Sequence, residues 1–171
     1  MVDGRERVPR IELFALDVGQ GDASLILLPD SHAPILFDCA DDWVVNQFMD
    51  NWGIRHLSAV IVSHLDRDHI GGMEGFLRNF TEAGGRVAKV FLSEDRHVEE
   101  ATPGAILAKS LIDYVITEAE AGRWAVYPVT VSDAPIASGS GWSVRLLAPR
   151  KRPGSRLPDR GSVPPTCCPV R

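Results

Sequence analysis

The sequence lacks several features that define whole classes of protein. It has no apolar run of about eighteen residues, which excludes an ordinary membrane-spanning helix. Residues 1–7 are charged, and no apolar segment with a small-residue cleavage site follows them, so no secretory signal is recognised. Cys39 stands alone, and Cys167 and Cys168 are adjacent, which is not the even, spaced set of a disulfide framework. Together these absences predict a cytoplasmic protein.

Basic residues are scarce in most of the chain. Residues 1–144 carry 11 Lys and Arg against 22 Asp and Glu, whereas residues 145–171 carry seven Lys and Arg against Asp159 alone. Nucleic-acid binding depends on Lys and Arg that neutralise phosphates. The acidic composition of residues 1–144 therefore argues against general nucleic-acid binding and leaves open only a local basic groove. The overall composition, 44% hydrophobic and 24% charged, is that of a soluble domain with a core.

Apolar periodicity and turn residues predict an α/β fold. Three strands at the start should form a meander, and helices then alternate with single strands. The predicted strands are 11–18, 23–28, 35–38, 57–63, 87–92, 124–131 and 142–147, and the predicted helices are 41–53, 71–83 and 103–122.

The predicted domain organisation is an N-terminal extension at residues 1–10, one domain at 11–149 and a tail at 150–171. The tail holds five of the twelve prolines and six basic residues without a periodic apolar pattern. This composition is typical of disorder.

The stretch 63–72 concentrates metal-binding side chains between a buried strand and a Gly-Gly pair. His64, Asp66, Asp68 and His69 are ligand types shared by zinc, manganese and iron. In an extended loop, positions 64, 66 and 68 would point the same way and position 69 would turn aside. The alternative interpretation is a solvated acidic loop whose histidines cap a strand and a helix.

Residues 63–72 resemble the H-x-H-x-D-H signature of the metallo-β-lactamase superfamily. Residues 16–23, 35–40 and 141–149 look like segments of one branch, the ComEC/Rec2-type competence domains and their soluble relatives. The resemblance covers residues 11–149. It implies a metallo-β-lactamase-like αββα sandwich, mainly its N-terminal half, with a dinuclear metal site at one edge of the two sheets.

The resemblance also implies roles for single residues of the loop. His64 would be a first-metal ligand, Asp68 and His69 would be second-metal ligands, and Asp68 would orient the attacking water. Asp66 stands where most members have histidine. A carboxylate there hardens the site and favours manganese or magnesium against zinc. The implied cofactor is one or two divalent ions, zinc or manganese.

Other residues are placed near the site by the same resemblance. Asp38 would close the third strand beside the metals. Gly19, Gln20, Gly21 and Asp22 would form the family's loop at the site, although a glycine-rich turn between two strands is equally compatible with a simple hairpin.

The implied chemistry is hydrolysis by a metal-bound hydroxide, acting on a small-molecule or phosphodiester substrate. Nucleic-acid cleavage is an analogy from the branch alone. A binding module with only a structural cation is a further alternative.

The chain lacks the ligands that the family takes from its second half. The histidines outside the loop are His32, His56 and His97, and Asp133 and Asp159 lack the context of a bridging ligand. We therefore expect a truncated chain with an uncovered apolar sheet face. The alternative function is an inactive half-domain that acts through self-association or a partner.

Overall fold

A computed structural model describes residues 10–29, 33–93, 102–129 and 134–146. Among the sequence-based predictions, those for the tail at 150–171, for most of the N-terminal extension and for His32, His97, Asp133 and Asp159 lie outside the described residues. The helices are α1 (Asp42–Asn51), α2 (Arg67–Ile70), α3 (Met73–Glu82) and α4 (Pro103–Glu120).

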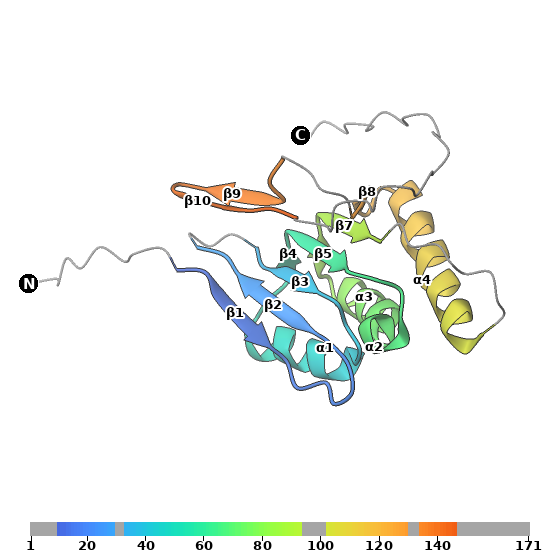
Figure 1. The fold of residues 1–171 in the computed structure, drawn as a ribbon. Coiled ribbons are helices and arrows are strands. Elements are labelled where there is room, and N and C mark those ends of the chain that lie inside the picture. The colour runs from blue at the N-terminus through green and yellow to red at the C-terminus, as the bar shows by residue number, and fades with distance from the viewer. Residues whose placement is uncertain (1–9, 30–32, 94–101, 130–133, 147–171) are drawn as a thin grey trace, which may run out of the picture.

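The strands form one large sheet and two small ones (Figure 1). The six-stranded sheet has the order β1-β2-β3-β5-β7-β8, in which β1, β2 and β3 are antiparallel neighbours and β3, β5, β7 and β8 run parallel. Its strands are β1 (Glu12–Ala15), β2 (Ser24–Leu27), β3 (Ile35–Phe37), β5 (Ala59–Val62), β7 (Lys89–Leu92) and β8 (Ala125–Pro128). The small sheets pair β4 (His56–Leu57) with β6 (Arg86–Val87), and β9 (Ala137–Gly139) with β10 (Trp142–Val144).

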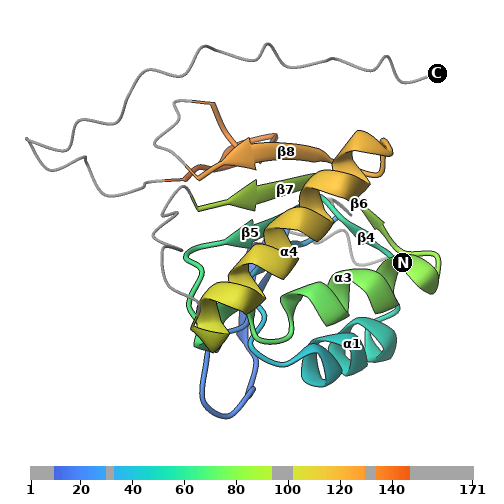
Figure 2. The same cartoon turned by 90° about the vertical axis from the view of Figure 1, so that its right-hand side faces the viewer.

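Helices cover one face of the large sheet, as Figure 2 shows for α1, α3 and α4. Side chains alternate along β5, so Val60 and Val62 pack in the helix-side core, whereas Ala59 and Ile61 belong to a second cluster on the opposite face. The β9–β10 hairpin supplies the cover for that second cluster through Ile136 and side chains packed around it. Both faces of β5 are buried, which is why its sequence is a continuous apolar run.

The helix-free face is covered only in part within the described residues. Leu13 of β1 pairs in register with Ile26 and points away from Phe14, which packs against the helix-side core. Leu13 is 69% exposed and Ile11 is 48% exposed. An apolar edge of the sheet is therefore open to solvent.

The α/β fold class and the strand-helix alternation are confirmed. Helix α1 begins after Asp41, whose side chain accepts a hydrogen bond from the Val44 N–H at 3.0 Å. The prediction of an extended ligand loop is wrong beyond Asp66, because residues 67–70 form helix α2. Strand β9 is an addition to the predicted set. No helix of the described ranges combines the length and the apolar character needed to cross a membrane.

Candidate metal centre

The candidate site lies where two neighbouring parallel strands end. Asp38 follows β3, and Ser63 and His64 follow β5, which pairs with β3 in parallel. Carboxyl ends of parallel strands lie at the same edge of a sheet, so these side chains meet without a long excursion of the chain. The Asp38 N–H donates to the Ile61 carbonyl oxygen at 2.9 Å and continues the sheet pattern to the edge of the site.

The loop between β1 and β2 reaches the same edge of the sheet (Figure 1), because Ser24 at the start of β2 pairs with Phe37 at the end of β3. The Asp22 N–H donates to the Asp68 carbonyl oxygen at 2.9 Å, and the Ala40 N–H donates to the Asp22 carbonyl oxygen at 3.1 Å. The predicted loop near the site is thus hydrogen-bonded to the segment that carries the histidines.

Gly21 allows this close approach. A Cβ at position 21 would lie 2.4 Å from the Asp68 carbonyl oxygen and 2.4 Å from the Ala40 Cβ, and the residue has φ +145°. Gly19 has φ +71° but no atom within 4 Å of its Cβ position, and it lies with Gln20 in the exposed part of the loop. Gly21 and Asp22 are therefore the residues of this loop that pack closely against the segment carrying the histidines.

Three of the four predicted ligands come together. One donor atom from each of His64, Asp68 and His69 lies within 4.8 Å of the other two. The short helix α2 produces this grouping, because it curls Asp68 and His69 back toward His64. The two imidazole rings lie 3.5 Å apart between centroids.

The fourth predicted ligand, Asp66, lies beside His64 alone. Its Oδ2 is 3.7 Å from His64 Nε2, and its side chain is 79% exposed. Asp22 takes a similar position beside His69, with Oδ2 at 3.5 Å from Nε2, the same nitrogen that lies 3.8 Å from Asp68 Oδ2. Each histidine therefore has one further carboxylate near its Nε2 atom.

Asp38 is buried, and its carboxylate contacts both Ser63 and His69. Its Oδ1 accepts from the Ser63 N–H at 2.8 Å, and its Oδ2 accepts from the Ser63 hydroxyl at 2.6 Å. Its Oδ2 also lies 2.9 Å from His69 Nδ1. Asp38 is the one non-glycine residue of the described ranges with positive φ, 53°, which aspartate tolerates better than most residues.

The donor set fits a divalent metal ion. A carboxylate can only accept a hydrogen bond, so the contact with Asp38 requires the proton of neutral His69 to be on Nδ1. The lone pair of His69 is then on Nε2, the atom that faces Asp68 and Asp22. Orientation of a ligand histidine by a carboxylate behind it is a recurrent arrangement in metal sites. Mixed imidazole and carboxylate donors suit zinc and manganese.

Cys39 does not extend this donor set, although it is adjacent to Asp38. Burial, together with the charges of Asp42, Asp41 and Asp38, raises the pKa of the thiol far above its usual range. Its Sγ contacts the Asp41 carbonyl oxygen at 3.6 Å. The residue is therefore a neutral part of the core.

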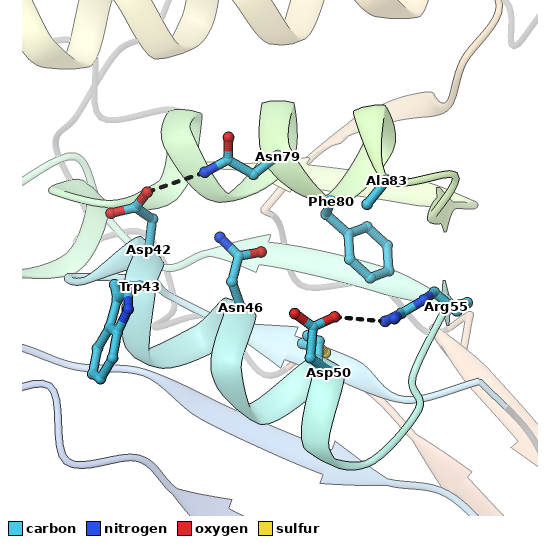
Figure 3. Close-up of a pocket in the computed structure, with 9 residues that line it drawn as sticks. Asp42, Trp43, Asn46, Asp50, Arg55, Asn79, Phe80 and Ala83 are labelled. Atoms are coloured by element: carbon cyan, nitrogen blue, oxygen red, sulfur yellow. Dashed lines mark hydrogen bonds and ion pairs between the residues drawn. The ribbon is translucent and has the colours of Figure 1, made fainter.

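A separate groove of about 270 Å³ lies between α1 and α3 (Figure 3). Two pairs of side chains cross this groove: Arg55 pairs with Asp50 at 2.9 Å, and Asn79 donates to Asp42 at 3.3 Å. No residue of the histidine cluster lines this groove. It is not part of the candidate site.

Ser63 is the residue that sequence reasoning missed. Its hydroxyl lies 2.6 Å from Asp38 Oδ2 and 2.9 Å from His64 Nδ1, so it connects the buried carboxylate with the first histidine. The available signal was a hydroxyl residue directly before a candidate ligand at the end of a buried strand.

Two relatives and one solved structure are similar to parts of this chain. ComE operon protein 3 of Bacillus subtilis (strain 168) is 28% identical over 104 residues, which cover 50% of this chain and 13% of that protein. Ribonuclease Z of Clostridium perfringens is 26% identical over 80 residues, which cover 47% of this chain and 25% of that protein. The chain thus spans a quarter or less of the length of these relatives. A diphosphatase from the PhnP family aligns with TM-score 0.39 and 19% identity over 66% of this chain and 39% of that one.

The family match is broader than any of these similarities. The metallo-beta-lactamase superfamily matches residues 16–147, a segment that contains the β1–β2 loop, Asp38 and the whole histidine loop. The resemblance inferred from the sequence motifs is confirmed at this level, and the similarity to ComE operon protein 3 agrees with the predicted branch. This chain belongs to the metallo-beta-lactamase superfamily.

Proposed function

We propose that the chain is a divalent-metal-dependent phosphodiesterase whose metal site is formed by His64, Asp68 and His69. The observation that carries the proposal is the grouping of these three donor atoms within 4.8 Å at the carboxyl ends of parallel strands. Ribonuclease Z, a relative of part of this chain, is by its name a nuclease, which supports phosphodiester chemistry. Zinc and manganese are the ions that this donor set favours.

His64, Asp68 and His69 would hold the divalent cation, which would supply a water of lowered pKa and a positive charge beside the attacked phosphoryl group. His69 and Asp68 have different roles in this proposal. His69, whose side chain is 13% exposed, is held by Asp38 and presents Nε2 to the site. Asp68 is 55% exposed, so its carboxylate has room to accept a proton from an attacking water.

Asp66 and Asp22 flank the proposed ligands. Each places a carboxylate oxygen within 3.7 Å of one histidine Nε2 atom, and both side chains are largely exposed. They add negative charge around the site and are the nearest candidates for a fourth ligand. Asp66 stands where the family signature has histidine, and a carboxylate at this position favours manganese over zinc as the bound ion.

The proposal predicts a metal-dependent turnover that depends on Asp68. Purified protein should bind zinc or manganese close to stoichiometrically in equilibrium dialysis and hydrolyse bis(p-nitrophenyl) phosphate only with metal. Asp68→Asn should lower turnover by about 100-fold or more, the usual share of a general acid or base. The matched variant is Asp66→Asn, with a more exposed carboxylate two residues away, and it should lower turnover by less. Turnover without metal, or equal loss in the two variants, would contradict the proposal, and metal binding without turnover would favour a binding module.

A second candidate function is self-association through the helix-free face of the sheet. The observation that favours it is the open apolar edge formed by Ile11 and Leu13, since exposed apolar patches commonly mark interfaces. We expect Leu13→Lys to convert a dimer to a monomer in size-exclusion chromatography with light scattering. Leu57→Ala, a change in the buried helix-side core, should weaken folding without this specific effect. A wild-type protein that stays monomeric at high concentration would remove this candidate.

A further inference from the structure

We propose that Ser63 is a positioning residue that fixes the tautomer of His64 and thereby links both histidines to one buried carboxylate, Asp38. The link to metal binding rests on the function proposed above, whereas the tautomer itself is a property of the metal-free protein. Ser63 would not touch substrate or metal, and it would act only through His64.

The direction of the Ser63 hydroxyl proton follows from its neighbours. Asp38 Oδ2 lies 2.6 Å from Ser63 Oγ, a separation typical of a hydroxyl that donates to a charged acceptor. The carboxylate has no proton to give, so the single hydroxyl proton of Ser63 points to Asp38. The Ser63 N–H donates to the other carboxylate oxygen at 2.8 Å and fixes the same residue a second time.

The proton position on His64 follows in turn. His64 Nδ1 lies 2.9 Å from Ser63 Oγ. Because the hydroxyl proton is already directed to Asp38, Oγ can only accept from the imidazole, and neutral His64 must carry its proton on Nδ1. The lone pair is then on Nε2, the atom that faces Asp66 at 3.7 Å.

Both histidines are therefore set to the same tautomer by one carboxylate. His69 contacts Asp38 directly through Nδ1 at 2.9 Å, and His64 contacts it through Ser63. Asp38 is 6% exposed, so water does not compete for its oxygens as it would at the surface. A neutral imidazole binds a metal through its unprotonated nitrogen. In the metal-free protein, the Nε2 atoms of both histidines are therefore already available as ligands.

The first measurement is the tautomer of each histidine in metal-free, ¹⁵N-labelled protein, from long-range proton–nitrogen NMR correlations at a pH of about 8.5, about two units above the ordinary pKa of histidine. Wild-type protein should show the proton on Nδ1 of His64 and of His69. Ser63→Ala should shift His64 toward the Nε2-protonated form, while His69 stays unchanged and reports that Asp38 is in place. Ser63→Thr keeps the hydroxyl and should restore the wild-type spectrum.

Ser58→Ala is the matched control. Ser58 precedes β5 as Ser63 follows it, and its hydroxyl donates to the Ala33 carbonyl oxygen at 2.6 Å. Its loss removes a serine hydrogen bond from the opposite end of the same strand and should leave both tautomers unchanged.

The second measurement is zinc affinity by competition with a chromogenic chelator. Ser63→Ala should bind zinc about 10- to 100-fold more weakly, the usual effect of removing a partner behind a ligand, and Ser63→Thr and Ser58→Ala should remain within about threefold of wild type. An Nε2 proton on His64 in the wild type, or an unchanged tautomer in Ser63→Ala, would overturn the proposal. A tautomer shift in a protein that binds neither zinc nor manganese would uphold the role of Ser63 and refute the proposed function, so the two can fail separately.

Discussion

Asp38→Ala should destabilise the protein by roughly 3 to 5 kcal/mol in urea unfolding followed by tryptophan fluorescence. The change removes a buried acceptor shared by the Ser63 N–H, the Ser63 hydroxyl and His69 Nδ1. A hydrogen bond to a charged group contributes about 1.5 to 3 kcal/mol, and the total loss is less than three times that because the freed donors, on exposed Ser63 and half-buried His69, can reach water. Alanine also fits the positive φ at this position less well than aspartate, which adds about 1 kcal/mol.

Asp41→Ala is the control for this experiment. Asp41 is three residues further on, and its side chain makes a single N-cap hydrogen bond with the Val44 N–H. Its loss should cost about 1 kcal/mol, as for other helix caps. If Asp38→Ala lowered the free energy of unfolding no more than Asp41→Ala, the three hydrogen bonds of Asp38 would not form in solution. Asp38 could then not orient the histidines as described.

Gly21→Ala should cost about 2 to 4 kcal/mol of unfolding free energy, combining an overpacked contact with a backbone conformation that side chains rarely adopt. Its new methyl group would lie 2.4 Å from the Asp68 carbonyl oxygen, so either the β1–β2 loop or helix α2 must move. Because Asp22 and Asp68 lie on these two segments, the variant should also bind zinc more weakly than wild type.

Gly19→Ala separates this contact from the general effect of a substituted glycine. Gly19 also has positive φ, but nothing lies within 4 Å of its Cβ position, so only the backbone term of about 1 kcal/mol applies. The comparison uses urea unfolding and zinc affinity for both variants. Equal effects at the two positions would show that the loop does not pack against α2 as described.

The sequence was sufficient to predict the elements that carry strong periodic or capping signals. The apolar run before Ser63 predicted a buried strand, and β5 is buried on both faces because helices and the β9–β10 hairpin enclose it. Asp41 predicted the start of α1, and Pro103 predicted the start of α4. In these cases the local signal and the tertiary packing favour the same structure.

The elements that were missed have weak local signals. Helix α2 is a single turn of four residues, which is too short to show a helical period. Strand β9 consists of Ala137, Ser138 and Gly139, which have little intrinsic strand preference and are held by pairing with β10. In both cases tertiary contacts determine the structure.

The site was predicted as a set of residues and not as a geometry. His64, Asp68 and His69 come together because α2 turns the chain, whereas the extended-loop prediction grouped Asp66 with His64 and Asp68 and turned His69 aside. The hydrogen bonds of Asp38 join residues 25 and 31 positions apart, a separation over which sequence periodicity carries no information. Only the fold reveals that one carboxylate supports both histidines.

The backbone around the site has a consequence for motion. Four amide hydrogen bonds join three separate segments, namely the β1–β2 loop, the turn after β3 and the stretch of α2 up to Gly72: Asp22 to Asp68, Ala40 to Asp22, Cys39 to His69 and Gly72 to Cys39. None of these bonds can open widely while the others stay closed, since each shares a residue or an adjacent residue with the next. The four amides therefore form one cooperative opening unit, and their hydrogen-exchange rates should rise and fall together. Metal binding at the histidines would therefore slow amide hydrogen exchange in the β1–β2 loop, more than forty residues away along the chain.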